Sequence, residues 1–290
     1  MHPYEIMTSE SQERMLAIVT PENLAAVTDI SKKWEIRSAV VGKVTEGGLL
    51  RILDGLGGEV LGEVPAVSLH EDAPLYERPL MPPTDLQSFQ ENQAEQLPEP
   101  EDITSDLLNL LAGTQWVTSQ YDSQLFLNTV VGPGGDAAVL RLKDPVSGED
   151  TGRGLAVTTD GNHRWCAVNP RLGTAMTVAE AVLNLSCVGA EPKALVNCLN
   201  FGNPENPTVM WQLSEAVDGM AEACIELDLP VVGGNVSLYN ESQGVNIDPT
   251  PIVGVIGVIN KLETPPPGMQ WEDGDRLMVI GPEAKGLSGS

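Results

Sequence analysis

The sequence predicts an α/β (α+β) protein made of two units, and three observations lead to this fold class. Short apolar runs with the period of a strand alternate along the chain with longer runs of helical period. The 290 residues are enough for about two domains with cores of their own. Residues 80–101 form an acidic, proline-containing segment that cannot bury enough apolar surface to fold by itself. We therefore interpret this segment as a linker.

In the first unit, residues 1–79, we expect one helix between the first and second of four strands. Thr20 and Pro21 form a helix start, with Thr as the cap and Pro in the first turn, and this helix is expected to end near Trp34. Glycine-containing turns near residues 45–48 and 55–58 separate the later strands. The expected strands are residues 14–19, 35–44, 49–53 and 59–64. This order predicts only the C-terminal part of an α/β sandwich.

The second unit, residues 117–262, carries a stronger pattern. It follows a linker region, residues 80–116, which ends in a short amphipathic helix over 103–111 that is expected to pack on this unit. Long helices are expected over residues 170–188 and 207–227. The expected strands are residues 136–142, 154–160, 193–199, 230–232 and 251–260, with one more from 275 to 281 in the last segment, 263–290.

The composition argues against several classes of partner and site. The 41 acidic and 16 basic residues give a net charge of −25, which repels nucleic acid and anionic membranes. No run approaches the roughly 20 apolar residues of a membrane span, and no secretory signal is visible, so we expect a cytoplasmic protein. The four cysteines form no C-x-x-C pair, and the three histidines give little support to a histidine base or a metal cluster.

The run VVGGNVSLYNES at residues 231–242 is the strongest candidate for a ligand site. Two glycines follow a short apolar strand, and glycine lets backbone N–H groups approach an anion closely. Asn235 and Ser237 add neutral oxygens for a hydrated cation or a phosphate. The alternative is a tight turn after a strand, which is the commoner role of such a run.

Polar residues in apolar surroundings supply further candidates. Glu180 and Asn184 lie four residues apart on one face of a predicted buried helix, where they share either a cation or a structural hydrogen bond. Asp136 follows a glycine-rich turn and either faces a ligand or caps its own loop. Asn197 lies near the end of a buried strand, where α/β folds hold ligands, although an Asn-capped loop is also consistent with the pattern. Asp160 is interpreted as a turn residue.

Four motifs, taken together, resemble one known family. They are SESQERM at residues 9–15, GGDAA at 134–138, NCLNFGNPE at 197–205 and VVGGNVSLYNE at 231–241. In this order they closely resemble phosphoribosylformylglycinamidine synthase, the small synthetase subunit of bacterial purine biosynthesis. The motifs extend over most of the chain, so a chance match is improbable.

The resemblance implies a fold like that of aminoimidazole-ribonucleotide synthetase, present in the family as two tandem copies. Residues 1–79 would be an incomplete C-terminal-type half, 117–262 an N-terminal-type, ATP-binding half, and 263–290 the start of another C-terminal-type half. The family's catalytic His lies in a half that has no counterpart here. We therefore expect no catalytic residue in this chain and no turnover by the chain alone.

The resemblance also implies roles for individual residues. Those that would bind the substrate, formylglycinamide ribonucleotide, are Glu10, Ser11, Gln12 and Ser237. Those that would bind ATP are Asn197 and Gly234, and Asn235 would bind Mg²⁺. Those of an auxiliary nucleotide and metal site would be Asp136, Glu180 and Asn184.

The implied activity is that of an ATP-dependent carbon–nitrogen ligase of the glutamine amidotransferase type. ATP would activate the amide oxygen of the substrate, and ammonia from a glutaminase subunit would form formylglycinamidine ribonucleotide, with a small third subunit completing the complex. Two alternatives stay open: an inert assembly fragment that homodimerises through an exposed sheet, or another ATP-using enzyme of this fold, such as a selenophosphate synthetase or thiamine-phosphate kinase relative.

Overall fold

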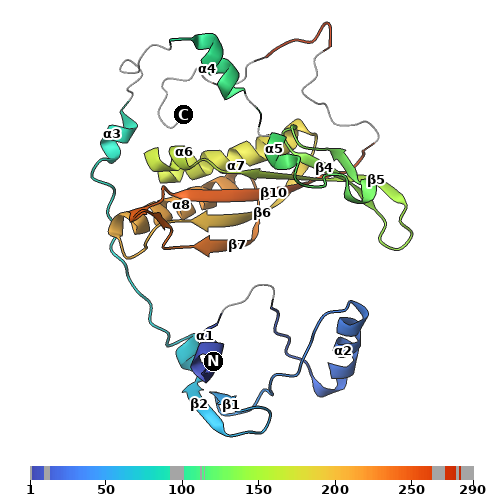
Figure 1. The fold of residues 1–290 in the computed structure, drawn as a ribbon, viewed down its shortest axis with the longest axis vertical. Helices are drawn as coiled ribbons and strands as arrows, with labels where there is room; N and C mark the ends of the chain where they lie inside the picture. The colour runs from blue at the N-terminus through green and yellow to red at the C-terminus, as the bar shows by residue number, and fades with distance from the viewer. Residues whose placement is uncertain are drawn as a thin grey trace. The chain divides into compact units, whose positions relative to one another are not determined.

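The computed structural model describes residues 2–9, 14–91, 101–111, 113, 115–262, 272–278 and 281 (Figure 1). The chain divides into two compact units, Met1–Glu77 and Arg78–Ser290, each with its own secondary structure. Within the described ranges, no helix is both long enough and apolar enough to cross a membrane.

The first unit contains two helices and one β-hairpin. α1 spans Pro3–Thr8, and α2 spans Leu24–Lys33 after a 3₁₀ turn over Pro21–Asn23, so the predicted proline-led helix is confirmed. β1 (Leu49–Leu53) and β2 (Val60–Pro65) pair antiparallel, which confirms the two later strands. Arg51 and Glu63 are direct cross-strand partners and form an ion pair with an N–O distance of 2.6 Å.

The other two strands predicted in the first unit are wrong. Residues 14–19 and 36–45 are irregular, and their apolar side chains are exposed, including Met15 at 95% and Val41 at 76%. Alternation alone does not make a strand, because the backbone N–H and C=O groups need a neighbouring strand. In the described part of this unit β1 and β2 pair with each other only, so these segments have no ladder to join.

In the described residues before the sheet of the second unit there are three short α-helices. They are α3 (Leu86–Gln90), α4 (Ile103–Leu110) and α5 (Gln115–Thr118). The side chain of Gln90 donates a hydrogen bond of 3.0 Å to the carbonyl oxygen of Val168, which ties α3 to the body of the unit. The helix predicted at 103–111 is confirmed, but Leu107 and Leu108 are exposed, so the expected burial of its apolar face is wrong.

A six-stranded sheet with the order β3-β4-β5-β10-β6-β7 forms the centre of the second unit (Figure 1). Its strands are β3 (Thr129–Val131), β4 (Ala138–Lys143), β5 (Asp150–Asp160), β6 (Glu191–Asn200), β7 (Val231–Ser237) and β10 (Thr250–Ile259). β10 is antiparallel to both β5 and β6, and β6 is parallel to β7. β5, β6 and β7 therefore run in one direction, and their carboxyl ends meet at one edge. A two-stranded hairpin, β8 (Glu241–Ser242) and β9 (Val245–Asn246), follows β7.

Two long helices, α7 and α8, cover one face of this sheet. α6 (His163–Val168) and α7 (Pro170–Cys187) follow β5, and α8 (Pro207–Glu226) follows β6. Each begins after an Asn whose side chain accepts backbone N–H groups of the first turn: Asn162, Asn169 and Asn206. The core lies between the helices and the sheet, and it contains Val178, Leu185, Leu195, Val253 and Val255, all fully buried.

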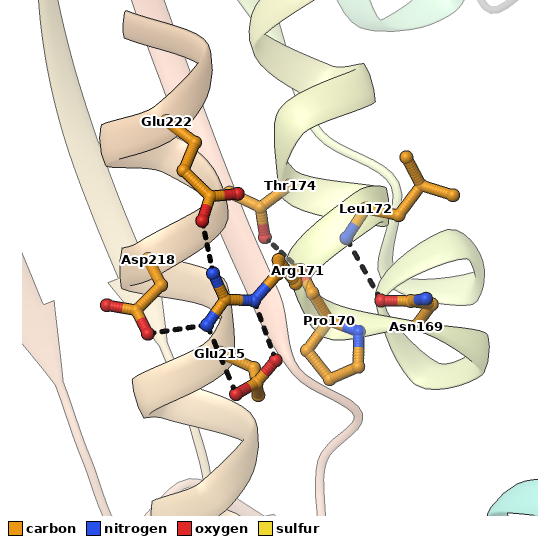
Figure 2. Close-up of polar contacts among 8 residues, drawn as sticks. All are labelled: Asn169, Pro170, Arg171, Leu172, Thr174, Glu215, Asp218 and Glu222. Carbon is orange, nitrogen blue, oxygen red and sulfur yellow. Dashed lines mark hydrogen bonds and ion pairs between the residues drawn. The ribbon is translucent and has the colours of Figure 1, made fainter. Parts of the chain in front are cut away.

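α7 and α8 approach each other closely where Arg171 meets Gly219. A Cβ on Gly219 would overlap the carbonyl oxygen of Arg171 and lie 2.7 Å from its carbonyl carbon, so only glycine fits there. The guanidinium group of Arg171 contacts three carboxylates of α8 (Figure 2): Glu215 at 2.9 Å, Asp218 at 2.7 Å, and Glu222. The hydrogen bond to Glu215 is the main cause that raises the pKa of Arg171. This cluster joins the two helices at the surface.

Most predicted elements of the second unit are confirmed, and the main differences concern short elements and the ends of strands. β7 continues to Ser237 instead of ending at residue 232, because it pairs with β6 along its length. β3 and α6 were not predicted, since three and six residues are too short to show a period. The strand predicted from residue 275 is wrong over 275–278, which are irregular and exposed, and residues 279–280 lie outside the described ranges.

Candidate functional site

Polar residues gather at the edge of the sheet where β5, β6 and β7 end. Asp160 is paired with Val253, Val253 with Asn197, and Asn197 with Gly234, so these four residues form one row across four strands. Cross-strand partners point to the same face of a sheet. Because Val253 is fully buried in the core under the helices, Asp160, Asn197 and Gly234 belong to the face that α7 and α8 cover.

Asn197 and Gly234, the two residues expected to bind ATP, are in direct contact. A Cβ on Gly234 would overlap Oδ1 of Asn197 and lie 2.7 Å from its Cγ. The Nδ2 group of Asn197 points to the sulfur of Met220 on α8, 3.5 Å away. The amide of Asn197 therefore fills the space that Gly234 leaves open. This packing explains why residue 234 is a glycine. The role of Asn197 and Gly234 in ATP binding stays a prediction.

Asp160 links β5 to α7, although the sequence pattern indicated only a turn residue. Its Oδ1 accepts a hydrogen bond of 2.7 Å from Nδ2 of Asn184, and its Oδ2 accepts one of 2.7 Å from the hydroxyl of Thr158. The signal that could have identified Asp160 is its place as the last residue of an apolar strand at the ligand-binding edge of an α/β sheet.

The predicted pair of Glu180 and Asn184 borders a pocket of about 350 Å³ on the surface of α7. The pocket is lined by Trp165, Met176, Ala179, Glu180, Leu183 and Asn184. Burial raises the pKa of the Glu180 carboxyl, and the negative charge of Asp160 raises it further. The structure therefore brings Glu180, Asn184 and Asp160 together beside an aromatic ring. Asp136 is exposed in the bend before β4 and is not among the lining residues.

Asn235 and Ser237 lie on the opposite face of β7 from Gly234. Asn235 is paired with Cys198 and Ser237 with Asn200, and these positions alternate with the row that faces the helices. Asn235 is exposed, whereas Ser237 is half-buried and bonded to Asn240. Gly234, a predicted nucleotide residue, and Asn235 and Ser237, predicted for the metal and the substrate, therefore occupy different faces of β7.

The oxygen atoms at this edge suit Mg²⁺ only if water molecules and ligand phosphates complete its coordination. Within the described ranges no three His, Cys, Asp or Glu side chains come together to hold a metal. Mg²⁺ is commonly bound by few protein oxygens together with water and the phosphates of a ligand. The exposed amide of Asn235 fits one such oxygen ligand. Glu10, Ser11 and Gln12, the predicted substrate loop, lie outside the described residues.

This end of the sheet combines two features that suit a phosphate-containing ligand. Gly233 and Gly234 are exposed in an edge strand, and the amide side chains of Asn197 and Asn235 flank them. The exposure of both glycines keeps the backbone accessible from one side. Such an arrangement can bind and orient a polyphosphate.

Comparison with known proteins gives the same fold. Residues 134–259 match the family described as AIR synthase related protein, N-terminal domain, and residues 1–55 match AIR synthase related protein, C-terminal domain. The phosphoribosylformylglycinamidine synthase subunit PurL of Moorella thermoacetica is 44% identical over all of this chain. The chain spans only 39% of that relative.

Solved structures of one PurL have the same architecture. T. maritima PurL complexed with ATP is 32% identical, with a TM-score of 0.64 over 89% of this chain and 40% of that one. T. maritima PurL complexed with FGAR is 31% identical, with a TM-score of 0.63 over 89% of this chain and 38% of that one. The chain is thus similar over its whole length to the PurL subunit of phosphoribosylformylglycinamidine synthase, and its residues 1–55 and 134–259 match the C-terminal and N-terminal domains of AIR synthase related proteins.

Proposed function

We propose that this chain forms part of an ATP-dependent ligase that converts formylglycinamide ribonucleotide, ATP and ammonia to formylglycinamidine ribonucleotide in purine biosynthesis. The observation that carries the proposal is the 44% identity to a PurL subunit over all of the chain. PurL structures complexed with ATP and with FGAR share the fold of this chain, which supports the same two ligand classes. Because the chain spans 39% of its relative, further parts of the machinery belong to the rest of that length.

The two faces of β7 would contact different ligands. The Asn197–Gly234 contact sets the spacing of β6 and β7 beneath the helices, and the backbone of β7 would lie along the nucleotide. On the opposite face, Asn235 would offer an oxygen to Mg²⁺, and Ser237 would contact the ribonucleotide. Glu10, Ser11 and Gln12 are proposed as substrate residues from the family resemblance alone. Bound Mg²⁺ and ATP would supply the phosphoryl group and neutralise its charge. The chain itself binds and orients.

The proposed partners follow from the same assignment. Ammonia would come from a glutaminase subunit, as in a glutamine amidotransferase, and a small third subunit would complete a cytoplasmic complex. The net charge of −25 supports neither nucleic acid nor an anionic membrane as a partner. A catalytic His, which the family resemblance places in another half, would have to be supplied by the rest of the enzyme.

The pocket beside Glu180 would be the auxiliary nucleotide site. Trp165 offers a ring on which a base can stack, and the oxygens of Glu180 and Asn184 would hold a cation. The chemistry of the lining supports this assignment for Glu180 and Asn184. Asp136 would join them only if its exposed bend moves toward the pocket.

Calorimetric titration of ATP into the chain, with Mg²⁺ or with EDTA, tests the proposal. We expect saturable binding that requires Mg²⁺ and that Asn235→Ala weakens by about 10-fold, which corresponds to roughly 1.4 kcal/mol. Asn260→Ala is the matched control, because Asn260 is an exposed amide just after β10, at the other end of the sheet. Equal heats with Mg²⁺ and EDTA, or equal effects of the two variants, would contradict the proposed metal and nucleotide roles.

One observation favours a second candidate, an assembly module. The sheet face opposite the helices exposes apolar side chains, including Val196 at 46% and Ile256 at 41%. A second copy covering this face would make a homodimer. Light scattering of the purified chain decides this: a dimer that Val196→Glu converts to a monomer would support assembly, and a wild-type monomer would exclude it.

A further inference from the structure

Asn240 holds the loop that follows β7 through hydrogen bonds of both its backbone and its side chain. Its Nδ2 lies 2.9 Å from the carbonyl oxygen of Ser237, 3.0 Å from that of Phe201 and 3.1 Å from the hydroxyl of Ser237. Its Oδ1 lies 3.3 Å from the same hydroxyl. The backbone N–H of Asn240 also donates to Phe201, over 3.1 Å.

The number of hydrogens on an amide nitrogen decides how these contacts are used. An Asn side chain has two N–H donors, and carbonyl oxygens can only accept. The two shortest contacts of Nδ2 are to the carbonyl oxygens of Ser237 and Phe201, so they take both hydrogens. The hydroxyl of Ser237 then donates its own hydrogen to Oδ1 of Asn240. Its lone pairs remain for a ligand.

The surroundings keep this arrangement in place. Phe201 is fully buried, and its backbone N–H donates to the carbonyl oxygen of Ser237 over 3.0 Å. Tyr239 has a φ of +60°, in the left-handed region that non-glycine residues seldom occupy, and its N–H donates to Gly202 over 2.8 Å. A strained residue persists only where its neighbours hold it, so the turn that presents Asn240 to Ser237 is fixed by the end of β6.

We propose that Asn240 is a positioning residue that fixes the hydroxyl of Ser237 as a hydrogen-bond acceptor. The group that Ser237 meets on the ligand is then a hydrogen-bond donor, such as an amide N–H or a sugar hydroxyl, and not a phosphate oxygen. This inference rests on the proposed function, because it takes Ser237 as a contact to the ribonucleotide. It adds a residue to the site and states the chemistry of the contact.

The hydrogen-bond arrangement can be tested without any ligand. In a chain labelled with ¹⁵N at asparagine, NMR reports the exchange of each side-chain NH₂ group with water. We expect the Asn240 group to exchange more slowly than that of the exposed Asn260, in the wild type and in Ser237→Ala, because its two acceptors are backbone carbonyls. Exchange as fast as that of Asn260 would overturn the arrangement.

Titration with formylglycinamide ribonucleotide tests the positioning role. Ser237→Ala should weaken binding about 3- to 10-fold, the effect of one hydrogen bond, and Asn240→Ala should weaken it by a similar factor. The affinity of the double variant should not fall below that of the single variant with the larger loss, because both substitutions remove the same contact. Asn246→Ala is the control: Asn246, at the end of β9, accepts a hydrogen bond of 2.8 Å from the N–H of Asn203 and not from Ser237.

The outcomes separate the inference from the proposed function. If Asn240→Ala and Asn246→Ala both lower the melting temperature but only Asn240→Ala weakens binding, the positioning role is supported. If Asn240→Ala binds like wild type, or if the losses of the single variants multiply in the double one, the role is overturned. If the wild type binds no ribonucleotide, the proposed substrate is contradicted together with the contact, while the exchange measurement still decides the arrangement around Asn240.

Discussion

The side-chain oxygen of Asn197 occupies the space in which a Cβ on Gly234 would lie. The two residues are register partners on parallel strands, and the rest of the Asn197 amide points to Met220 on α8. A polar side chain therefore fills the contact between β6, β7 and α8 where a larger residue at 234 would separate them. The accessible backbone at the edge of the sheet depends on this fit.

Gly234→Ala should destabilise the second unit, whereas Gly233→Ala should not. The methyl group that Gly234→Ala adds would overlap Oδ1 of Asn197, and overpacking of this kind costs about 1–3 kcal/mol. A Cβ on Gly233 would lie 3.8 Å from Val196, an ordinary contact, so that variant should stay within about 0.5 kcal/mol of wild type. Urea unfolding of the two variants provides the comparison.

Removing the Asn197 side chain should relieve most of this effect. In the double variant Asn197→Ala, Gly234→Ala, the close approach that remains is 3.1 Å to the backbone oxygen of residue 197. The loss of unfolding free energy in the double variant should therefore be smaller than the sum of the losses in the two single variants. Strict additivity would contradict the overlap as the cause.

Asp160→Ala should cost about 1–3 kcal/mol of unfolding free energy, because it leaves Asn184 and Thr158 without their acceptor in a half-buried position. Asp136→Ala is the comparison, because Asp136 is exposed, and this substitution should cost less than about 0.5 kcal/mol. Denaturant unfolding at neutral pH measures both. Equal effects would show that the link between β5 and α7 adds no stability.

Glu180→Gln should stabilise the protein at neutral pH and lose this advantage in acid. The pKa of Glu180 is raised above its ordinary value of 4.5, first by burial and then by Asp160. The folded state therefore favours the protonated form, so Glu180 lowers stability once pH rises through its folded pKa. Well below pH 4.5, Glu180 is protonated in both the folded and the unfolded state, so the stability difference between wild type and Glu180→Gln should vanish.

Melting temperatures of wild type and Glu180→Gln from about pH 4 to about pH 8 give this profile, with the exposed Glu149→Gln as control. An advantage that is constant over this range would contradict a titration of Glu180. If Mg²⁺ raises the melting temperature of the wild type at neutral pH and so brings it closer to that of Glu180→Gln, the Glu180 carboxylate also binds the cation.

Arg171→Ala should weaken the α7–α8 contact in a salt-dependent way. The guanidinium group meets Glu215, Asp218 and Glu222 near the surface, where salt screens charges. The fall in melting temperature should therefore be larger at about 20 mM than at about 500 mM NaCl. Arg164→Ala, on the exposed start of α6, is the control. A fall that is independent of salt would indicate lost packing instead of lost charge pairing.

The sequence predicted the long helices and central strands of the second unit because each has its own period, and Pro170 and Pro207 mark the starts of α7 and α8. It could not predict that residues 14–19 and 36–45 are irregular, because a strand requires a partner that local pattern does not reveal. Glu180 and Asn184 were predicted from their helical spacing, whereas Asp160 was missed because its importance comes from the register of β5 against β10. The separation of Asn235 from Gly234 likewise follows from pleating once β7 is extended.

Ligand binding at the end of β7 is tested most directly by following the backbone amides of the ¹⁵N-labelled chain while ATP with Mg²⁺, and then formylglycinamide ribonucleotide, is added. We expect saturable chemical-shift changes at Gly234, Asn235 and Ser237, at the edge where β5, β6 and β7 end. Saturating ligands that leave these three amides unchanged would contradict it.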